Sequence, residues 1–469
     1  MARLALPLLL LTVLALRAED KTKPASDPVG LWLGLLKVGP TELRIAFRIE
    51  KTKDGPLAGK LISLDQNNTE IPLDKAAVID GTLSLELAGG AIKYSATADE
   101  KGGWTGEFSQ GGKKLPLTLV RIDKLPTAKR PQTPKKPYPY PSEDVTFANE
   151  SAKIKLAGTL TLPKGDGPFP AVVLVSGSGP QDRDETLFEH KPFLVIADHL
   201  AKKGIACLRY DDRGTAKSGG IFIGSTSADF ATDAYAAVNF LKGNPKIDPK
   251  RIGICGHSEG GVIAPLVAVA HPDDVAFIVL LAGPGISGGR ILFEQSLDFS
   301  KQGGETIDAR EVQDMMDAVL PILKSAKSTA DAKEKLKVAF GKLIAAEKDE
   351  KKRKEAEKGL GAAIDQYSDP WLRWFAGHDP APTLAKVKCP VLALNGENDV
   401  QVKPKQNLEA IGAALKESGH RDYECVEFKG LNHLFQKCKT GAIAEYRAIE
   451  ETIAPGVLLK ISDWIAARK

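Results

Sequence analysis

The residues Gly256-His257-Ser258-Glu259-Gly260 match the pattern Gly-x-Ser-x-Gly. A strand-like segment, residues 251–255, comes directly before them, and an apolar run that can begin a helix follows. A strand, a tight turn and a helix expose a serine oxygen at the helix N-terminus, and glycines leave room for the crowded backbone of such a turn. We therefore predict that Ser258 is a nucleophile.

A serine hydroxyl needs a base to accept its proton and a carboxylate to hold that base in the right tautomer. When the nucleophile follows an inner strand, the acid and then the base come later in the chain. His433 follows the strand-like residues 423–428 and a short turn, which predicts a loop at the carboxyl edge of a sheet, so we predict His433 as the base. The other six histidines precede the acid, lie in the nucleophile turn or occupy surface-like segments: His190, His199, His257, His271, His378 and His420.

The acid is expected between the nucleophile and the base. The strand-like residues 389–394 end in the loop Asn395-Gly396-Glu397-Asn398-Asp399-Val400. A carboxylate at the end of a strand can reach an imidazole on the neighbouring loop. We predict Asp399 as the acid, and Glu397 in the same loop is the alternative.

Acyl transfer at a serine places negative charge on the former carbonyl oxygen, and preorganised backbone N–H groups stabilise that charge. One expected donor is the amide of Glu259, which follows the nucleophile. The second is expected from Ser176-Gly177-Ser178-Gly179-Pro180, whose small residues let the backbone approach a substrate. We predict the amide of Ser178, with Gly177 next, and a plain glycine-rich turn is the alternative.

An aromatic segment, residues 367–375, is unusual in a chain with 6% aromatic residues. Its rings either line the substrate pocket or pack in a core. The pocket candidates are Gly177, Trp371, Trp374, Phe375 and Phe435.

The remaining motifs give no sign of a cofactor. Glycine-rich phosphate loops, His-Glu-x-x-His and Cys-x-x-Cys spacings are absent from the sequence, so we expect no cofactor and no metal. The segment Tyr210-Asp211-Asp212-Arg213-Gly214 follows a strand-like run. It either contacts the substrate or, more commonly, forms a charged network that braces the loop 176–180.

These candidates require a sheet whose strands end at one edge. Apolar runs alternate with helical stretches, and continuous apolar strands indicate a parallel sheet covered on both faces. The runs are 171–176, 206–210, 252–255, 277–281 and 391–394. Between the last two the strand rhythm lapses into a helix-periodic, charged insert. The prediction is a doubly wound α/β fold with a helical cap at about residues 286–385.

The N-terminal part has a different pattern. Residues 30–121 alternate apolar and polar side chains between glycine-rich turns, which predicts antiparallel strands and a small β barrel or sandwich over residues 25–123. Six prolines between positions 126 and 141 indicate an extended linker, residues 124–142. The α/β domain is then expected over residues 143–469.

Composition and charge exclude several classes of protein. The 469 residues are 43% hydrophobic and 26% charged with a net charge of +4, so the chain has no strongly basic patch for nucleic acid and no composition typical of disorder. Five cysteines are an odd number, unlike a disulfide framework, although Cys425 and Cys438 could pair.

The first residues are typical of an export signal. Arg3 precedes the apolar residues 4–16, and the small residue Ala18 follows. Charged residues at 19 and 20 end this run too early for a membrane helix. We expect a signal peptide over residues 1–18, cleavage after Ala18, and export to the periplasm or the medium.

The chain resembles the α/β-hydrolase superfamily, and within it the bacterial carboxylesterases of the EstD type, which are related to serine aminopeptidase-like hydrolases. The likeness covers residues 143–469 and rests on the segments 177–185, 208–214, 256–261, 395–399 and 430–435. It implies a triad at Ser258, Asp399 and His433, a helical cap, hydrolysis of short acyl esters and often a β-rich N-terminal domain. Ala216 stands where such chains often carry glycine.

The expected function is that of an exported serine hydrolase that cleaves carboxylic esters through an acyl-enzyme. One alternative keeps the same three residues but takes a peptide, as an aminopeptidase-like serine peptidase does. Another is a non-catalytic binding protein built on a hydrolase scaffold. The expected partner is a small-molecule ester, with no nucleic acid and no stable membrane span, and the sequence leaves the oligomeric state open.

Overall fold

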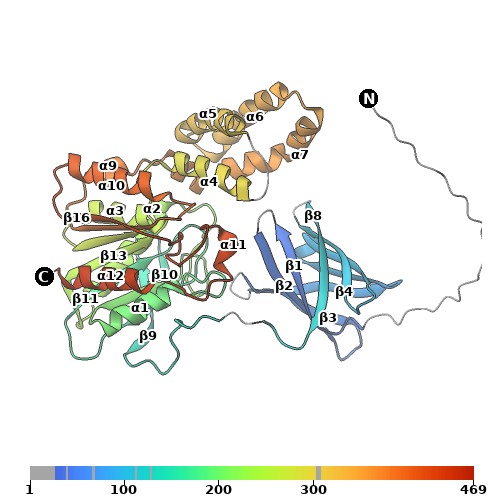
Figure 1. The fold of residues 1–469 in the computed structure, drawn as a ribbon, viewed down its shortest axis with the longest axis horizontal. Helices are drawn as coiled ribbons and strands as arrows, with labels where there is room; N and C mark the ends of the chain where they lie inside the picture. Colours follow the sequence, from blue (N-terminus) through green and yellow to red (C-terminus); the bar gives the residue numbers. More distant parts are fainter. Residues whose placement is uncertain are drawn as a thin grey trace, which may run out of the picture. The chain divides into compact units, whose positions relative to one another are not determined.

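The computed structural model describes residues 27–38, 41–65, 69–110, 113–126, 129–302 and 308–468. The predicted signal peptide, residues 1–18, lies outside the described residues. The chain divides into two compact units, and the last boundary between them falls between Leu125 and Pro126; the segments Leu36–Arg44 and Ser63–Thr69 group with the second unit. Figure 1 colours the strands before this boundary from blue to cyan and the later elements from teal to red.

The strands before the boundary form a closed barrel in which β1 pairs with β8. Apolar side chains alternate along these strands, as in β6, where Ile92, Tyr94 and Ala96 are buried and the residues between them are exposed. The predicted β domain is therefore a barrel and not a sandwich. Its elements are β1 (Gly30–Val38), β2 (Thr41–Lys51), β3 (Leu57–Ser63), β4 (Thr69–Ile79), β5 (Thr82–Leu87), η1 (Ala88–Gly90), β6 (Ile92–Ala98), β7 (Trp104–Gln110) and β8 (Lys113–Ile122).

The second unit contains an eight-stranded sheet in the order β16-β15-β14-β13-β11-β12-β10-β9. Strands β11 to β16 are parallel, and β9 and β10 are antiparallel to their neighbours. Because β12 lies on one side of β11 and β13 on the other, the strand order reverses there, where α/β folds bind ligands. The strands are β9 (Ser142–Asn149), β10 (Ile154–Thr161), β11 (Phe169–Val175), β12 (Ala206–Tyr210), β13 (Ile247–His257), β14 (Phe277–Leu281), β15 (Val391–Gly396) and β16 (Tyr423–Phe428).

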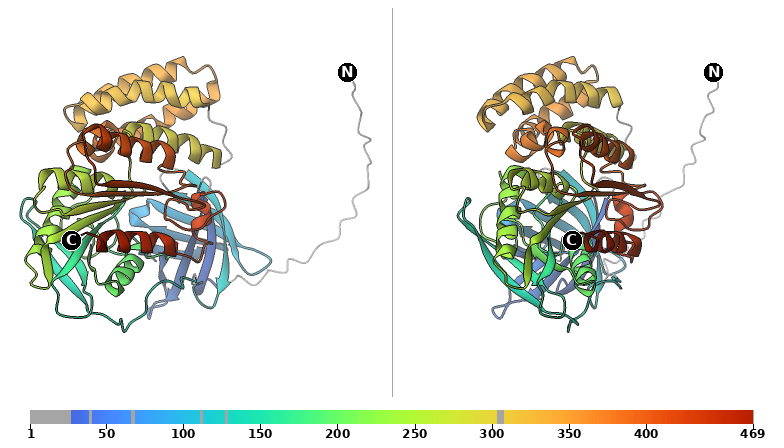
Figure 2. Two further views of the ribbon diagram at one scale, coloured as in Figure 1. Left: turned by 60° about the vertical axis from the view of Figure 1, so that its left-hand side comes forward. Right: turned by 90° about the vertical axis from the view of Figure 1, so that its left-hand side faces the viewer.

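Helices cover both faces of this sheet, which explains the continuous apolar runs of its inner strands. Helices α1 (Pro192–Lys202) and α12 (Pro455–Ala466) pack on one face. Helices α2 (Ser227–Lys242), α3 (Gly260–Ala270) and α10 (Pro404–Glu417) pack on the other (Figure 2). The short helices α9 (Ala381–Leu384) and α11 (Ile443–Tyr446) lie in connecting segments. The predicted α/β fold class is confirmed.

A helical cap separates β14 from β15, as the sequence predicts. Polar residues that accept a backbone N–H begin its helices, such as Asp308 before α5, Ser328 before α6 and Asp369 before α8. Its apolar side chains form a core of their own around Leu336 and Phe340. The cap lies on the side of the sheet that α2, α3 and α10 cover (Figure 2). Its helices are α4 (Gly288–Gln302), α5 (Ala309–Ser325), α6 (Thr329–Ala346), α7 (Glu350–Tyr367) and α8 (Pro370–Gly377).

Packing, and not disulfides, holds the α/β unit together. All five cysteines lie in the described ranges and carry free thiols, so Cys425 and Cys438 are not paired. Within those ranges, no helix combines the length and apolar character needed to cross a membrane.

Candidate active site

Ser258 lies in a sharp turn between β13 and α3. Its φ of 51° is in the left-handed region, which non-glycine residues seldom adopt. The neighbouring glycines are required by close packing, because a Cβ on Gly256 would lie 1.9 Å from the Gly260 carbonyl oxygen. A Cβ on Gly260 would lie 2.2 Å from the carbonyl oxygen of Val175. The turn therefore has the strained, glycine-dependent geometry that the sequence predicts for a nucleophile.

Asp399 and His433 come from the loops after β15 and β16 and are both buried. The Nδ1 atom of His433 lies 2.7 Å from Oδ2 of Asp399. The other oxygen, Oδ1, accepts from the amides of Gln401 at 2.8 Å and Val402 at 2.9 Å. Because an ionised carboxylate only accepts, Nδ1 carries the proton and Nε2 keeps a lone pair for accepting one.

The alternative acid, Glu397, lies elsewhere. Its carboxylate accepts the amide of Gly430 at 2.8 Å, and the side chain is exposed. The structure therefore brings Asp399, and not Glu397, to the imidazole of His433.

Ser258 and His433 line the same cavity, which has a volume of about 200 Å³. Of the pocket candidates, Gly177, Trp371 and Phe375 also line it. The rings of Trp371 and Phe375 are four residues apart on α8 and stack with their centroids 5.3 Å apart. The cap thus supplies an aromatic wall to the cavity that Ser258 lines.

Two pocket candidates are wrong. Trp374 does not line the cavity, because its ring points to another side of α8 and stacks on His378 at 4.5 Å. Phe435 is only 2% exposed and packs in the core between the sheet and α12. Phe435 follows the loop residue His433 by only two positions, but its side chain is already part of the hydrophobic core.

Of the two predicted amide donors, Glu259 follows Ser258 directly and Ser178 lines the same cavity. Among the residues that the structure describes, the backbone N–H groups of Ser178 and Glu259 donate to no other protein atom. The amide of Gly177 is occupied, because it donates to Oε1 of Glu185 at 2.8 Å. A Cβ on Gly177 would lie 3.2 Å from that of Ser258, so glycine lets this loop approach the turn closely.

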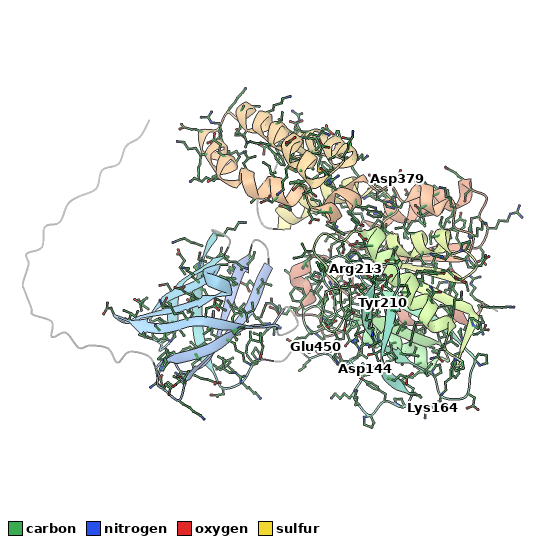
Figure 3. All side chains as sticks on the ribbon, turned by 180° about the vertical axis from the view of Figure 1, so that it is seen from behind. Asp144, Lys164, Tyr210, Arg213, Asp379 and Glu450 are labelled. Atoms are coloured by element: carbon green, nitrogen blue, oxygen red, sulfur yellow. The ribbon has the colours of Figure 1, made fainter. Side chains whose placement is uncertain are left out.

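A charged network braces the loop 176–180, in agreement with one of the two alternatives for residues 210–214. Asp212 accepts from Ser176 Oγ at 2.8 Å and from the amide of Gln181 at 2.9 Å, and burial raises its pKa well above the ordinary value. Arg213 pairs with Asp233 of α2 at 2.6 Å. Figure 3 labels Arg213 beside Tyr210, and no residue from 210 to 214 lines the cavity.

Sequence reasoning missed three buried ionisable side chains at this site. His257 Nδ1 lies 2.8 Å from Oε1 of Glu185. Burial opposes the charged imidazole, but the Glu185 carboxylate outweighs it, so the pKa of His257 is raised. Burial also raises the pKa of Glu259, whose Oε1 accepts from Ser227 Oγ at 2.5 Å and from Trp371 Nε1 at 2.8 Å. The signal in the sequence that could have indicated two of them is that Ser258 lies between two ionisable residues, His257 and Glu259.

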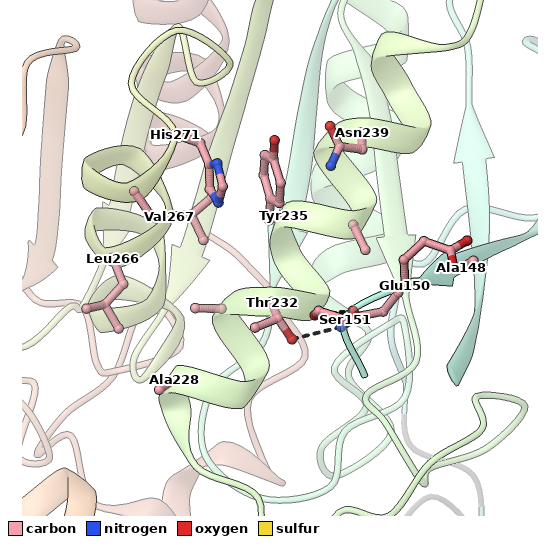
Figure 4. Close-up of a pocket in the computed structure, with 14 residues that line it drawn as sticks. Ala148, Glu150, Ser151, Ala228, Thr232, Tyr235, Asn239, Leu266, Val267 and His271 are labelled. Carbon is pink, nitrogen blue, oxygen red and sulfur yellow. Dashed lines mark hydrogen bonds between the residues drawn. The ribbon is translucent and has the colours of Figure 1, made fainter. Parts of the chain in front are cut away.

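A larger cavity of about 610 Å³ lies along α2 and α3, beside the end of β9 (Figure 4). Alanines and other apolar groups form most of its wall, and Asn149 donates to Thr232 Oγ1 at 2.8 Å. None of the predicted site residues lines it. The smaller cavity is therefore the candidate active site.

Comparison with known proteins finds a peptidase family and an esterase among the matches. The family model described as X-Pro dipeptidyl-peptidase (S15 family) matches residues 152–424. Esterase EstD of Thermotoga maritima is 30% identical over 338 residues, which are 71% of this chain and 71% of that protein. The uncharacterized protein PA2218 of Pseudomonas aeruginosa is 35% identical over 138 residues, 29% of this chain and 35% of that protein. The solved esterase Pf2001 of Pyrococcus furiosus has 17% identity and a TM-score of 0.39, covering 70% of this chain and 92% of that one.

Proposed function

Because the chain belongs to the X-Pro dipeptidyl-peptidase (S15) family, within the α/β-hydrolases, and is a relative of an esterase, we propose that it is a serine hydrolase that cleaves carboxylic esters with short acyl chains. The observation that carries this proposal is that His433, paired with the buried Asp399, lines the same cavity as Ser258 in its strained turn.

The proposed reaction has two acyl-transfer steps. His433 Nε2 takes the proton of Ser258 Oγ as this oxygen bonds to the ester carbonyl carbon. The amides of Ser178 and Glu259 donate to the resulting oxyanion. His433 then protonates the leaving alkoxide, which departs as an alcohol and leaves an acyl-enzyme. A water molecule, deprotonated by His433, attacks the acyl carbon, and the carboxylic acid leaves as Ser258 regains its proton.

The lining of the cavity supports an ester more than a peptide. Glu185 is the one carboxylate among the lining residues, all of which the structure describes, and its Oε1 already accepts from Gly177 and His257. A peptide N-terminal ammonium needs a carboxylate to pair with, and here it would have to share the Glu185 carboxylate with His257. The volume of about 200 Å³ is below the roughly 300–1,000 Å³ of typical ligand pockets, which supports a short acyl chain.

The test compares Ser258→Ala with the wild type on p-nitrophenyl esters of increasing acyl length and on a dipeptide p-nitroanilide. We expect Ser258→Ala to lower kcat at least about 10⁴-fold. Ser95→Ala, at an exposed position of β6, is the matched control and should keep full activity.

Three outcomes would contradict the proposal. Full turnover by folded Ser258→Ala would exclude this nucleophile. Faster release of p-nitroaniline than of p-nitrophenol would favour the peptidase alternative. A wild-type protein that neither hydrolyses these esters nor reacts with a fluorophosphonate probe would favour the binding protein.

We also propose that the protein is exported and cleaved after Ala18. The support is the basic residue Arg3, the apolar residues 4–16 and the small residue at position 18. N-terminal sequencing of protein from the periplasm or medium should begin at Glu19. Cytoplasmic protein that retains residues 1–18 would contradict export.

A further inference from the structure

Two ionisable side chains of the cavity, Glu185 and His257, have no part in the acyl-transfer steps. Glu185 lies in the loop that follows β11, and His257 is the last residue of β13. Their side chains are 7% and 9% exposed, and Nδ1 of His257 lies 2.8 Å from Oε1 of Glu185. An ionisable pair this well buried is costly unless its hydrogen bonds are satisfied.

Both ring nitrogens of His257 face acceptors. Nδ1 faces the Glu185 carboxylate, and Nε2 lies 3.1 Å from the main-chain carbonyl oxygen of His433. A neutral imidazole has a single N–H, so only the imidazolium can donate both bonds. The carboxylates of Glu185 and Asp399 favour the positive charge of the His257 imidazolium. The ring of His433, in the loop after β16, also lies beside the His257 ring, with the two ring centroids 4.8 Å apart.

The same pair connects three loops that carry the proposed catalytic groups. Oε1 of Glu185 accepts the amide of Gly177, next to Ser178, at 2.8 Å. His257 precedes Ser258 in the chain, and its Nε2 reaches the main chain of His433. One carboxylate and one imidazolium therefore join the loop 176–180, the nucleophile turn and the loop of the base.

We propose that the Glu185–His257 ion pair is a positioning unit that fixes the main chain of His433 and the amide of Ser178 relative to Ser258, an inference that rests on the proposed function. Misplacing reacting groups costs rate more than substrate affinity. Loss of either partner should therefore lower kcat and leave KM nearly unchanged.

The positioning also depends on pH. The pKa of His257 is raised, so the imidazolium is present at lower pH and is lost as the pH rises through the raised value. A deprotonated ring keeps one of its two bonds. Wild-type kcat should therefore fall on the alkaline side of the ordinary histidine pKa, in a step that His257→Gln, which carries no titratable group at this position, lacks.

The kinetic test uses the full-length chain with Glu185→Gln, His257→Gln and the double variant, assayed on p-nitrophenyl acetate across the pH range. We expect each single change to lower kcat roughly 10- to 100-fold with KM within about threefold. The double variant should resemble the single variants, because the two residues act as one unit. Unchanged kcat, multiplicative losses, or the same alkaline step in His257→Gln would overturn the proposal.

A measurement on the wild type keeps the proposal testable if the variants do not fold. In ¹⁵N-histidine-labelled protein titrated upward through the ordinary histidine range, one histidine should keep both N–H groups to a higher pH than the other six. Loss of the second N–H from all seven rings at or below the ordinary histidine pKa would overturn the proposal. Absence of ester turnover in the wild type would instead contradict the proposed function, and the NMR result would still report on the ion pair.

Discussion

The indole N–H of Trp371 donates to the carboxylate of Glu259 at 2.8 Å. Glu259 directly follows Ser258, and Trp371 lies on α8 of the cap. The residue whose amide we propose as an oxyanion donor thus also holds the aromatic wall of the cavity. The cap and the shape of the cavity are coupled to the turn of Ser258 through one buried side chain.

This contact predicts that Trp371 limits the length of the acyl chain. Trp371→Ala should enlarge the cavity and raise kcat/KM for p-nitrophenyl octanoate relative to acetate by at least about 10-fold, since one methylene in an apolar pocket changes this ratio about 10-fold or more. Trp374→Ala, three positions along the same helix but outside the cavity, is the control. Equal octanoate-to-acetate ratios in the two variants would show that Trp371 does not form the acyl wall.

Asp399→Asn should lower kcat by about 10⁴-fold without unfolding the protein. The amide oxygen can still accept from Gln401 and Val402, but the NH₂ group would face Nδ1 of His433 and favour the tautomer with the proton on Nε2, which cannot act as a base. Glu397→Gln is the matched control from the same loop. A comparable loss of kcat in both variants would contradict the assignment of the acid.

Gly256→Ala should strongly destabilise the α/β unit. The added Cβ would lie 1.9 Å from a backbone oxygen, so we expect a loss of more than about 3 kcal/mol in unfolding free energy. Gly341→Ala tests the opposite case, because Gly341 is exposed in α6 with open space around its Cβ position. That change should stabilise the cap by about 1 kcal/mol through helix propensity. Thermal melting of the two variants checks the prediction, and a similar change in melting temperature in both variants would contradict it.

His190 should make the folded protein sensitive to acid. Burial lowers its pKa to about 4, with Nδ1 2.9 Å from Thr452 Oγ1 and Nε2 3.0 Å from the Tyr446 carbonyl oxygen. Between pH 6.5 and 4 the unfolded chain binds a proton that the folded state excludes, so stability falls as the pH falls through this window. The loss attributable to this group is about 3 kcal/mol.

Urea unfolding from pH 7 to pH 4 checks this linkage. His190→Gln should lose about 3 kcal/mol less over that range than the wild type, whatever its stability at pH 7. Parallel curves for the two proteins would rule out His190 as the source of the acid sensitivity.

Local signals in the sequence were sufficient for the fold class and for naming candidates at the site. Continuous apolar runs predict a parallel sheet because strands covered on both faces need them, and that α/β fold is what the structure has. Glycines around Ser258 predict a crowded turn, since no side chain fits there. Strand type and turn crowding depend on residues that are neighbours along the chain, so the amino-acid sequence alone is enough to predict them.

Tertiary structure decided which side chains meet. Closure of the N-terminal strands into a barrel depends on pairing between β1 and β8, and the choice of Asp399 over Glu397 depends on how two loops lie side by side. Burial of Phe435 and the contact between Glu185 and His257, 72 positions apart, have no local signature. Local sequence determines the conformation of each segment, but partners distant in the chain are set by packing of the whole unit, because hydrogen-bond and ion-pair geometry exists only once the segments are brought together.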